Sequence, residues 1–496
     1  MLHHTHRTIT RLRLQRWLTA AIAMSLLLAA CSKDGGSRDT GGEPVTLKIL
    51  YWNDQSFQHE YGMLFYALHP EIDVEVVTAN SIKFDSGDNY AELYDEFIRE
   101  QQIDVLFLTE DQYERYAADG RLASLEPFLT RDKIDVEGFI PGLIEHLREK
   151  GGGELYGLAP MFSSQVIYYN KDLFDRFNID YPTDKMSWEE VLNLAARFPT
   201  DGSDEDRIWG LSLGGYPSDL YQLGQRIGLT LGLRLVNPAD KQLLVDSDAW
   251  VEVYEMAHKA LRSGTIYQGN NMNFSGPYEE YLLSNPFVGG KAAMMIEGSY
   301  LMQQIREAQE YVPDKAVKNW DIVTVPVDPS NPDYTHETSF YQIFAINADS
   351  PNREAAWKFI RYVHSDDFAR VKAKTFNGQF PVRKSYFNDQ EGRNMAAFYL
   401  LKPSQASLYA NMDDLPGDFY MQYYTAGNEE FQAVMEDRKT VREALASLRT
   451  RLQAVMDAAA SNPDGGQDVA GTPGAGEASF ESGIWVETGG GEAQTE

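Results

Sequence analysis

Cysteine is almost absent from this chain, which contains one cysteine, Cys31, among 496 residues. A single thiol cannot form an intramolecular disulfide, and it cannot supply the several thiolates of a zinc ribbon. Because Cys31 directly follows the apolar run Leu26–Ala30 near the start of the chain, no thiol remains in the expected folded body for catalysis or thiol exchange. The sequence therefore excludes disulfide scaffolding, redox exchange, cysteine catalysis and cysteine metal sites.

The first thirty residues have the layout of a signal peptide. Four arginines and no acidic residue precede an apolar stretch, Trp17–Ala30, that is too short to span a bilayer. Leu28–Cys31 resembles the lipobox of bacterial lipoproteins, after which cleavage leaves an acylated cysteine as the first residue. The alternative is an ordinary signal peptide with an incidental cysteine. We expect residues 1–30 to be removed and Cys31 to anchor the protein outside the cytoplasm on the bacterial cell membrane.

Positive charge is also scarce. The chain has 44 lysines and arginines against 74 aspartates and glutamates, which gives a formal net charge of −30. Such a surface repels nucleic acid and anionic lipid, so no nucleic-acid partner is expected. A local basic pocket for one small anion remains open, because net charge does not describe a single site.

Motifs of common enzymes are missing. The sequence has no His-Glu-x-x-His, no Gly-x-Ser-x-Gly and no Walker A motif, and six widely scattered histidines lie outside the leader. Neighbouring acids such as Glu189-Glu190 point in different directions on a helix, so they predict solvated faces rather than a catalytic pair. We expect no catalytic residue, cofactor or metal site, although a secreted carbohydrate-active enzyme with separated carboxylates remains an alternative.

Both ends of the mature chain have compositions that cannot build a core. We expect residues 31–44, rich in Gly, Ser and Asp, to act as a flexible tether, and residues 461–496 to be a disordered acidic and Gly-rich tail. The remaining body, about 45–460, is long enough for two globular lobes.

Strand and helix patterns alternate along this body. Apolar runs predict strands at 47–52, 72–77, 104–108 and 208–213, and a period near 3.6 predicts helices around 90–98 and 441–455. Ser187 with Glu190 forms a capping-box pattern, and Ser350-Pro351 predicts a further helix start. The fold class is therefore α/β, with largely parallel strand pairing.

Several short motifs occur in an order and spacing that resemble a known family. The resemblance extends from about Leu47 to about Met456 and is carried by Tyr116–Leu122, Gly153–Pro160, Val166–Phe174, Ser187–Glu190, Gly290–Met295 and Phe344–Asn352. These segments resemble the family 1 extracellular solute-binding proteins of ABC importers, the group that includes the maltose-binding protein. The resemblance implies a two-lobe, periplasmic-binding-protein-like fold with a hinge and a ligand cleft between the lobes.

Lobe boundaries follow from the same resemblance. It implies a first lobe of 45–158 plus about 343–398 and a second lobe of about 162–340 plus about 400–460. The chain would cross between them near Leu158–Met161, near Tyr341–Ile346 and close to Leu400. Pro160 would stiffen the first crossing, although it reads equally well as a plain turn.

Ligand-binding positions are expected in the loops that follow strands, because ligands of open α/β sheets meet the carboxyl ends of the strands. The resemblance implies hydroxyl recognition by Asn53, Asp54 and Asp111, and aromatic stacking by Tyr300 and Tyr424. The full set of implied ligand-binding residues is Trp52, Asn53, Asp54, Glu110, Asp111, Phe162, Ser163, Ser164, Tyr216, Gly298, Ser299, Tyr300, Arg383 and Tyr424.

Simpler interpretations of some of these residues stay open. Glu110 and Asp111 could instead form the capped and solvated start of a helix. Any single tyrosine could belong to the core, since aromatic residues make up 12% of the chain. Arg383 could bond across the cleft or lie on the surface.

The resemblance implies a monomeric, lipid-anchored receptor that captures a solute and delivers it to the transmembrane subunits of an ABC permease. The expected ligand is a mono- or oligosaccharide, held by closure of the two lobes and not chemically changed. A secreted carbohydrate-active enzyme and a solute-sensing accessory of a membrane kinase are the alternatives.

Overall fold

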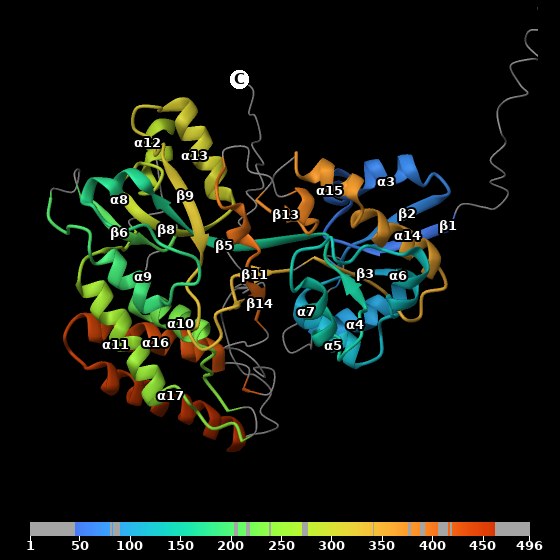
Figure 1. Ribbon diagram of the computed structural model, residues 1–496. Coiled ribbons are helices and arrows are strands. Elements are labelled where there is room, and N and C mark those ends of the chain that lie inside the picture. Colours follow the sequence, from blue (N-terminus) through green and yellow to red (C-terminus); the bar gives the residue numbers. More distant parts are fainter. Residues whose placement is uncertain are drawn as a thin grey trace, which may run out of the picture.

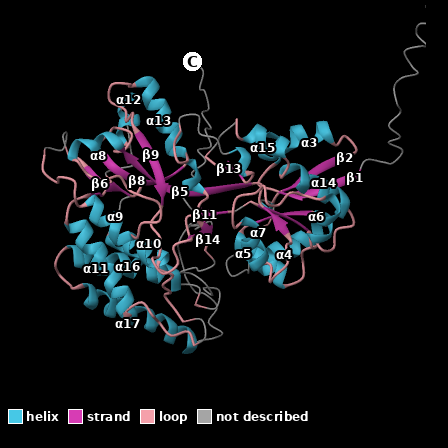
Figure 2. Ribbon diagram, in the orientation of Figure 1, coloured by secondary structure: helices cyan, strands magenta, loops and turns pink. Residues whose placement is uncertain are grey.

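The computed structural model describes residues 45–79, 82, 90–202, 207–214, 219–237, 240–269, 276–340, 342–374, 378–386, 392–404, 415–416 and 419–461. It has the mixed α/β architecture expected from the sequence, arranged as two lobes (Figures 1 and 2). The predictions for Cys31, the tether, the tail, Tyr216 and Tyr341 lie outside the described residues. No described helix has the length and apolar character that a membrane crossing needs.

A five-stranded sheet forms the centre of the first lobe, in the order β2-β1-β3-β12-β4. Strand β1 is parallel to β2 and β3, whereas β12 is antiparallel to β3 and β4. All four residues of β3 are buried, which explains its continuous apolar sequence. The bounds are β1 Val45–Leu50, β2 Ile72–Val77, β3 Val105–Leu108, β4 Gly157–Leu158 and β12 Ile343–Ile346.

Helices surround this sheet in Figure 1. The first of them combines α2, a π-helical turn and α3 in one continuous run from Asp54 to Leu68. The bounds are α2 Asp54–Phe57, the π turn Gln58–Gly62, α3 Met63–Leu68, α4 Tyr90–Gln101, α5 Glu110–Ala118, α6 Glu126–Asp132, α7 Leu143–Lys150, α14 Arg353–Val363 and α15 Asp366–Lys372.

The second lobe is built on a seven-stranded sheet in which β11-β5-β8-β6-β7 follow one another and β9 and β13 also pair with β5. Its strands are β5 Met161–Asn170, β6 Trp209–Ser212, β7 Ile266–Tyr267, β8 Ala292–Gly298, β9 Trp320–Thr324, β11 Thr338–Ser339 and β13 Phe380–Pro381. A two-stranded sheet of β10 Tyr334–Thr335 and β14 Lys402–Pro403 is separate. The helices are α8 Lys171–Phe177, α9 Trp188–Ala195, α10 Leu220–Thr230, α11 Asp248–Arg262, α12 Tyr278–Ser284, α13 Tyr300–Tyr311, α16 Phe419–Met435 and α17 Val441–Ser461.

Strand β5 alternates between two apolar cores. Tyr168 packs with Met295 in the core that continues into the first lobe. Ile167 and Tyr169 point to the opposite face, where α9, α10, α11, α16 and α17 contribute to the other core. Side chains along a strand alternate between faces, so this one strand belongs to both cores.

Two connections between the sheets are short. Leu158 pairs in the first sheet and Met161 in the second, so only Ala159 and Pro160 separate them. Farther along the chain, β11 pairs with β5, and β12 begins in the first sheet at Ile343. Strand β5 runs between the lobes in Figure 1. Strand β13 lies within the predicted first-lobe segment 343–398 but pairs with β5 of the second sheet, and the lobe boundaries remain a prediction.

Most of the predicted elements are present, but the prediction of largely parallel pairing is wrong, because β5 and β12 are antiparallel to every strand with which they pair among the described residues. The strand at 72–77 and the capping box of Ser187 and Glu190 are confirmed. The predicted helix start at Ser350-Pro351 is wrong, because α14 begins at Arg353 after Asn352. The Ser350 hydroxyl instead donates a hydrogen bond to Asp104 Oδ1 at 2.6 Å. Because Asp104 directly precedes β3, this bond ties the turn to the amino end of the strand, opposite the end that leads into α5.

Candidate functional site

Carboxyl ends of strands in both lobes face the connecting segments. In the first sheet, Leu108 at the end of β3 pairs with Ile343, the first residue of β12 after the crossing. In the second sheet, β6 and β8 are parallel, and Gly298 at the end of β8 pairs with Gln165 in the first half of β5. The loops after β1, β3, β6 and β8 therefore lie at the edges of the two sheets nearest the crossings, which is where α/β sheets bind ligands.

The loop after β1 presents an exposed aromatic ring next to two polar residues. Trp52 is 54% exposed, and its ring makes an edge contact with Phe107 at 5.2 Å between centroids. Asn53 caps α2 by accepting the Ser56 N–H at 2.8 Å, and Asp54 Oδ1 accepts from Gln58 at 3.0 Å. The indole can thus stack against a ligand, and both carboxylate oxygens of Asp54 lie on an exposed side chain.

Glu110 differs from both interpretations of the sequence. Thr109 caps α5 in a capping box with Gln112, and the Glu110 side chain turns inward. Its Oε2 lies 2.6 Å from His146 Nε2, and its Oε1 accepts the Phe340 N–H at 3.1 Å. Burial opposes the charge of this carboxyl, but the hydrogen bonds and charge of its partners lower its pKa overall. Glu110 thus forms an internal link to the crossing segment, whereas Asp111 stays exposed on the first turn of α5.

The predicted residues of β5 are oriented in different directions. Phe162 is buried and packs against Phe340 and Phe380 at 6.4 and 5.8 Å between ring centroids, so the expectation that its side chain faces a cleft is wrong. Ser163 and Ser164 pair through their hydroxyls with Ser339 and Thr338 of β11, at 3.0 and 3.1 Å. These side chains hold the two crossing strands together.

The loop after β8 carries the other expected aromatic group. Tyr300 is 52% exposed at the start of α13, and the buried Ser299 donates its hydroxyl proton to the carbonyl of Gly378. The Gly298 carbonyl accepts from Tyr168 Oη at 2.8 Å. Tyr424, on α16, is partly exposed and contacts the ring of Tyr221 at 6.0 Å. Tyr300 therefore follows a strand at the expected edge, whereas Tyr424 belongs to the helical layer.

Arg383 is neither a surface residue nor a bond across the lobes. It is 8% exposed and donates from Nε to the carbonyl of His364 and from Nη1 to the carbonyl of Asp135, both at 3.0 Å. Its guanidinium also lies 4.5 Å from the ring centroid of Phe139. The arginine thus fastens first-lobe segments to each other, and both sequence interpretations are corrected.

A polar cluster in the second lobe was missed from the sequence. Arg226 on α10 donates from Nε to Glu337 Oε1 at 2.9 Å and from Nη2 to Gln165 Oε1. Glu297, one residue before the predicted Gly298, lies near this pair, and burial raises the pKa of its carboxyl. Glu297 lies between the motif Gly290–Met295 and the predicted Gly298, but 111 residues separate Arg226 from Glu337 and no local pattern marks them.

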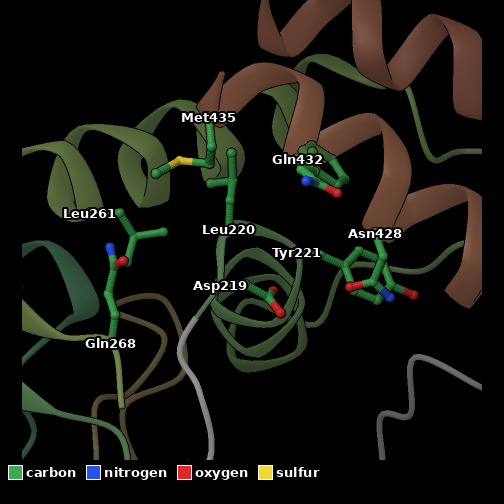
Figure 3. Close-up of a pocket in the computed structure, with 9 residues that line it drawn as sticks. Asp219, Leu220, Tyr221, Leu261, Gln268, Asn428, Gln432 and Met435 are labelled. Carbon is green, nitrogen blue, oxygen red and sulfur yellow. The ribbon is translucent and has the colours of Figure 1, made fainter. Parts of the chain in front are cut away.

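A separate cavity of about 380 Å³ lies within the second lobe (Figure 3). It lies between α10, α11, α16 and the segment after β7, and its lining begins at Asp219, where the loop after β6 ends. Its lining residues are Asp219, Leu220, Tyr221, Leu261, Gln268, Asn428, Phe431, Gln432 and Met435. Within the described part of the chain, no cluster of three or more His, Cys, Asp or Glu side chains is arranged to hold a metal ion.

Structures of known proteins share this fold. A sugar transporter from Rhizobium etli in an open conformation matches with a TM-score of 0.59 at 22% identity, over 83% of this chain and 100% of that protein. The sugar-binding protein MalE of Xanthomonas citri matches with a TM-score of 0.59 at 16% identity, over 84% and 98% of the two chains. At these identities the likeness shows the fold, which is that of two-lobe solute-binding proteins.

Sequence comparisons agree with this fold. A binding protein of Brucella abortus is 25% identical over 304 residues, which are 59% of this chain and 68% of that protein. The sn-glycerol-3-phosphate-binding periplasmic protein of Rhizobium meliloti is 20% identical over 361 residues, 70% and 78% of the two chains. The family model for bacterial extracellular solute-binding proteins matches residues 52–369. The chain belongs to the bacterial extracellular solute-binding protein family.

Proposed function

We propose that the protein captures a polyhydroxylated solute, a mono- or oligosaccharide, between its lobes and delivers it to the membrane subunits of an ABC importer. The observation that carries this proposal is the convergence of strand ends from both sheets on the connecting segments. Trp52 and Tyr300, which follow β1 and β8, supply exposed aromatic faces for the C–H surface of a sugar ring. Asn53, Asp54, Asp111 and Ser163 are proposed as its polar contacts, whereas the buried Ser164 joins the crossing strands through Thr338.

Closure of the lobes would provide the transport signal. A ligand that contacts both lobes binds the closed arrangement more tightly than the open one, and it therefore shifts the population toward the closed state. Short connections such as Ala159-Pro160 limit the movement to a few backbone angles. The importer would recognise the closed form.

Lipid attachment at Cys31 is the second part of the proposal. The lipobox-like sequence and the following tether would hold the two lobes above the bacterial cell membrane, close to the importer. Because acyl chains bury many methylene groups, such an anchor keeps a receptor at the membrane without a spanning helix.

A thermal-shift screen of residues 45–461 tests the binding function. Mono- and oligosaccharides are compared with sn-glycerol 3-phosphate and amino acids, and each mixture is analysed for products after long incubation. A ligand specific for the folded state adds about 2.7 kcal/mol of stability at a hundredfold excess over its dissociation constant. Stabilisation by a saccharide that stays intact supports the proposal, whereas its conversion to product would identify a carbohydrate-active enzyme.

A further inference from the structure

Glu297 occupies a constrained position at the edge of the second sheet. It is the penultimate residue of β8 and pairs with Val166 of β5. Its Oε1 accepts the N–H of the next residue, Gly298, at 2.8 Å. Its Oε2 faces Gly214, the residue two positions after β6, where an added Cβ would lie 2.9 Å from that oxygen. Gly214 also has a φ of 95°, so this loop favours glycine and leaves room for the carboxylate.

The basic side chain whose charge acts on Glu297, Arg226, is already paired with another carboxylate. Arg226 forms an ion pair with Glu337 at 2.9 Å and donates a second hydrogen bond to Gln165, and both charged side chains of the pair are largely buried. Glu297 forms no ion pair within the described residues, and neither does Asp54 in the first lobe. The positive charges of Arg306 and Arg393 oppose the burial-induced rise in the pKa of the Tyr168 hydroxyl. This hydroxyl donates a hydrogen bond to the Gly298 carbonyl. The charge that faces the proposed ligand site from β8 and α10 is therefore negative.

We propose that this arrangement selects an uncharged polyhydroxylated ligand over a phosphorylated one, with Glu297 Oε2 accepting a hydrogen bond from a ligand hydroxyl. The inference rests on the function proposed above and narrows its ligand class. A carboxylate forms charge-assisted hydrogen bonds with hydroxyl groups, whereas a phosphate brought to the same place meets a like charge. The chemistry thus separates this chain from its sn-glycerol-3-phosphate-binding relatives.

The position of Glu297 also has a cost for the folded protein. Burial disfavours its charged form and raises its pKa, and the Gly298 N–H compensates only in part. A carboxyl whose pKa is raised on folding destabilises the protein at neutral pH, and this effect disappears as the pH falls toward the unfolded value of 4.5. A binding role predicts that a neutral replacement stabilises the unliganded protein and weakens the ligand complex. If Glu297 had only a structural role, its replacement would not combine a more stable unliganded protein with a weaker ligand complex.

Calorimetric titration of the wild type and three variants tests the inference. The probes are maltose, D-mannitol and sn-glycerol 3-phosphate, and the variants are Glu297→Gln, Glu337→Gln and, as the matched control, Glu310→Gln, an exposed glutamate on α13 of the same lobe. The wild type is expected to bind a neutral probe and not sn-glycerol 3-phosphate. Glu297→Gln should weaken the neutral complex by roughly tenfold or more and raise the melting temperature at pH 7. Glu310→Gln should change neither quantity.

The Glu337→Gln variant tests the same inference through a gain of affinity rather than a loss. Without its partner carboxylate, Arg226 is available to an anion, so this variant should gain measurable affinity for sn-glycerol 3-phosphate. Tighter binding of sn-glycerol 3-phosphate than of the neutral probes by the wild type would overturn the inference and leave solute binding intact. An unchanged neutral affinity in Glu297→Gln would also overturn it. Stabilisation by amino acids alone in the thermal-shift screen would refute the proposed saccharide function as well. A complete lack of response in the wild type and in Glu337→Gln would count against the charge argument.

Discussion

Replacement of Glu110 by alanine should destabilise the protein through the segment that connects its lobes. The carboxylate bonds to His146 at 2.6 Å and to the Phe340 N–H at 3.1 Å, and His146 is only 4% exposed. Removal of the carboxylate takes a hydrogen-bond partner away from His146 and from the Phe340 N–H. Loss of the charged acceptor costs about 1–3 kcal/mol for a buried donor, and we expect a free energy of unfolding lower by that amount or somewhat more at pH 7.

The exposed ion pair on the same two helices is the matched control. Glu114 on α5 lies 2.6 Å from Lys150 on α7, but its side chain is 53% exposed. Solvent screens such a pair, so Glu114→Ala should lower the free energy of unfolding by no more than about 0.5 kcal/mol. Urea denaturation, monitored by tryptophan fluorescence in both variants and the wild type, measures the difference.

The free energy of unfolding should also depend on pH in a defined direction. Because folding lowers the pKa of Glu110, its contribution is fully present above the unfolded value of 4.5 and is lost as the pH falls through the lower folded value. The conservative variant Glu110→Gln should therefore differ most from the wild type near pH 7 and approach it in acid. A difference that is constant from pH 7 to pH 3, or equal losses in the Glu110→Ala and Glu114→Ala variants, would refute the reasoning.

Three other predictions follow from the structure. Gly224→Ala should lower the free energy of unfolding by about 1–3 kcal/mol, because the new Cβ would lie 2.0 Å from the ring of Tyr254; a melting temperature equal to that of the wild type would contradict this packing. Trp52→Ala should weaken saccharide binding by roughly tenfold with little change in the melting temperature of the unliganded protein, since the ring is 54% exposed; calorimetry measures it, and an unchanged affinity would exclude a stacking role. Cys31→Ser should release the full-length protein from the membrane fraction of the cells that express it, and retention there would argue against acylation.

Several parts of the candidate site could be predicted because their signals are local. The motif around Gly298 and Tyr300 directly follows the apolar run of β8, and Trp52 and Asp54 directly follow β1. The rule that ligands meet the carboxyl ends of strands therefore selected these loops, and their role in binding remains a prediction. Glu297 was passed over within the same motif, because sequence alone does not show that its carboxylate would face Gly214.

Residues that pair over long distances in sequence could not be assigned in advance. Glu110 has its hydrogen-bond partners 36 and 230 positions away, and those partners draw inward a residue that is typical of a solvated helix start. The charged group of Arg383 similarly became internal because two carbonyls from other segments approach it.

The sequence by itself determined the α/β class, the leader with its lone cysteine as a pattern, and the family motifs, because apolar periodicity, capping residues and motif order are properties of neighbouring positions. Only the tertiary structure decided which polar groups are available at the proposed site. Arg226 is paired with Glu337 and Glu110 is hydrogen-bonded to His146, whereas Glu297 keeps an oxygen beside Gly214. The physical reason is that burial and ion pairing depend on which distant segments meet in space, and a linear pattern does not contain those distances.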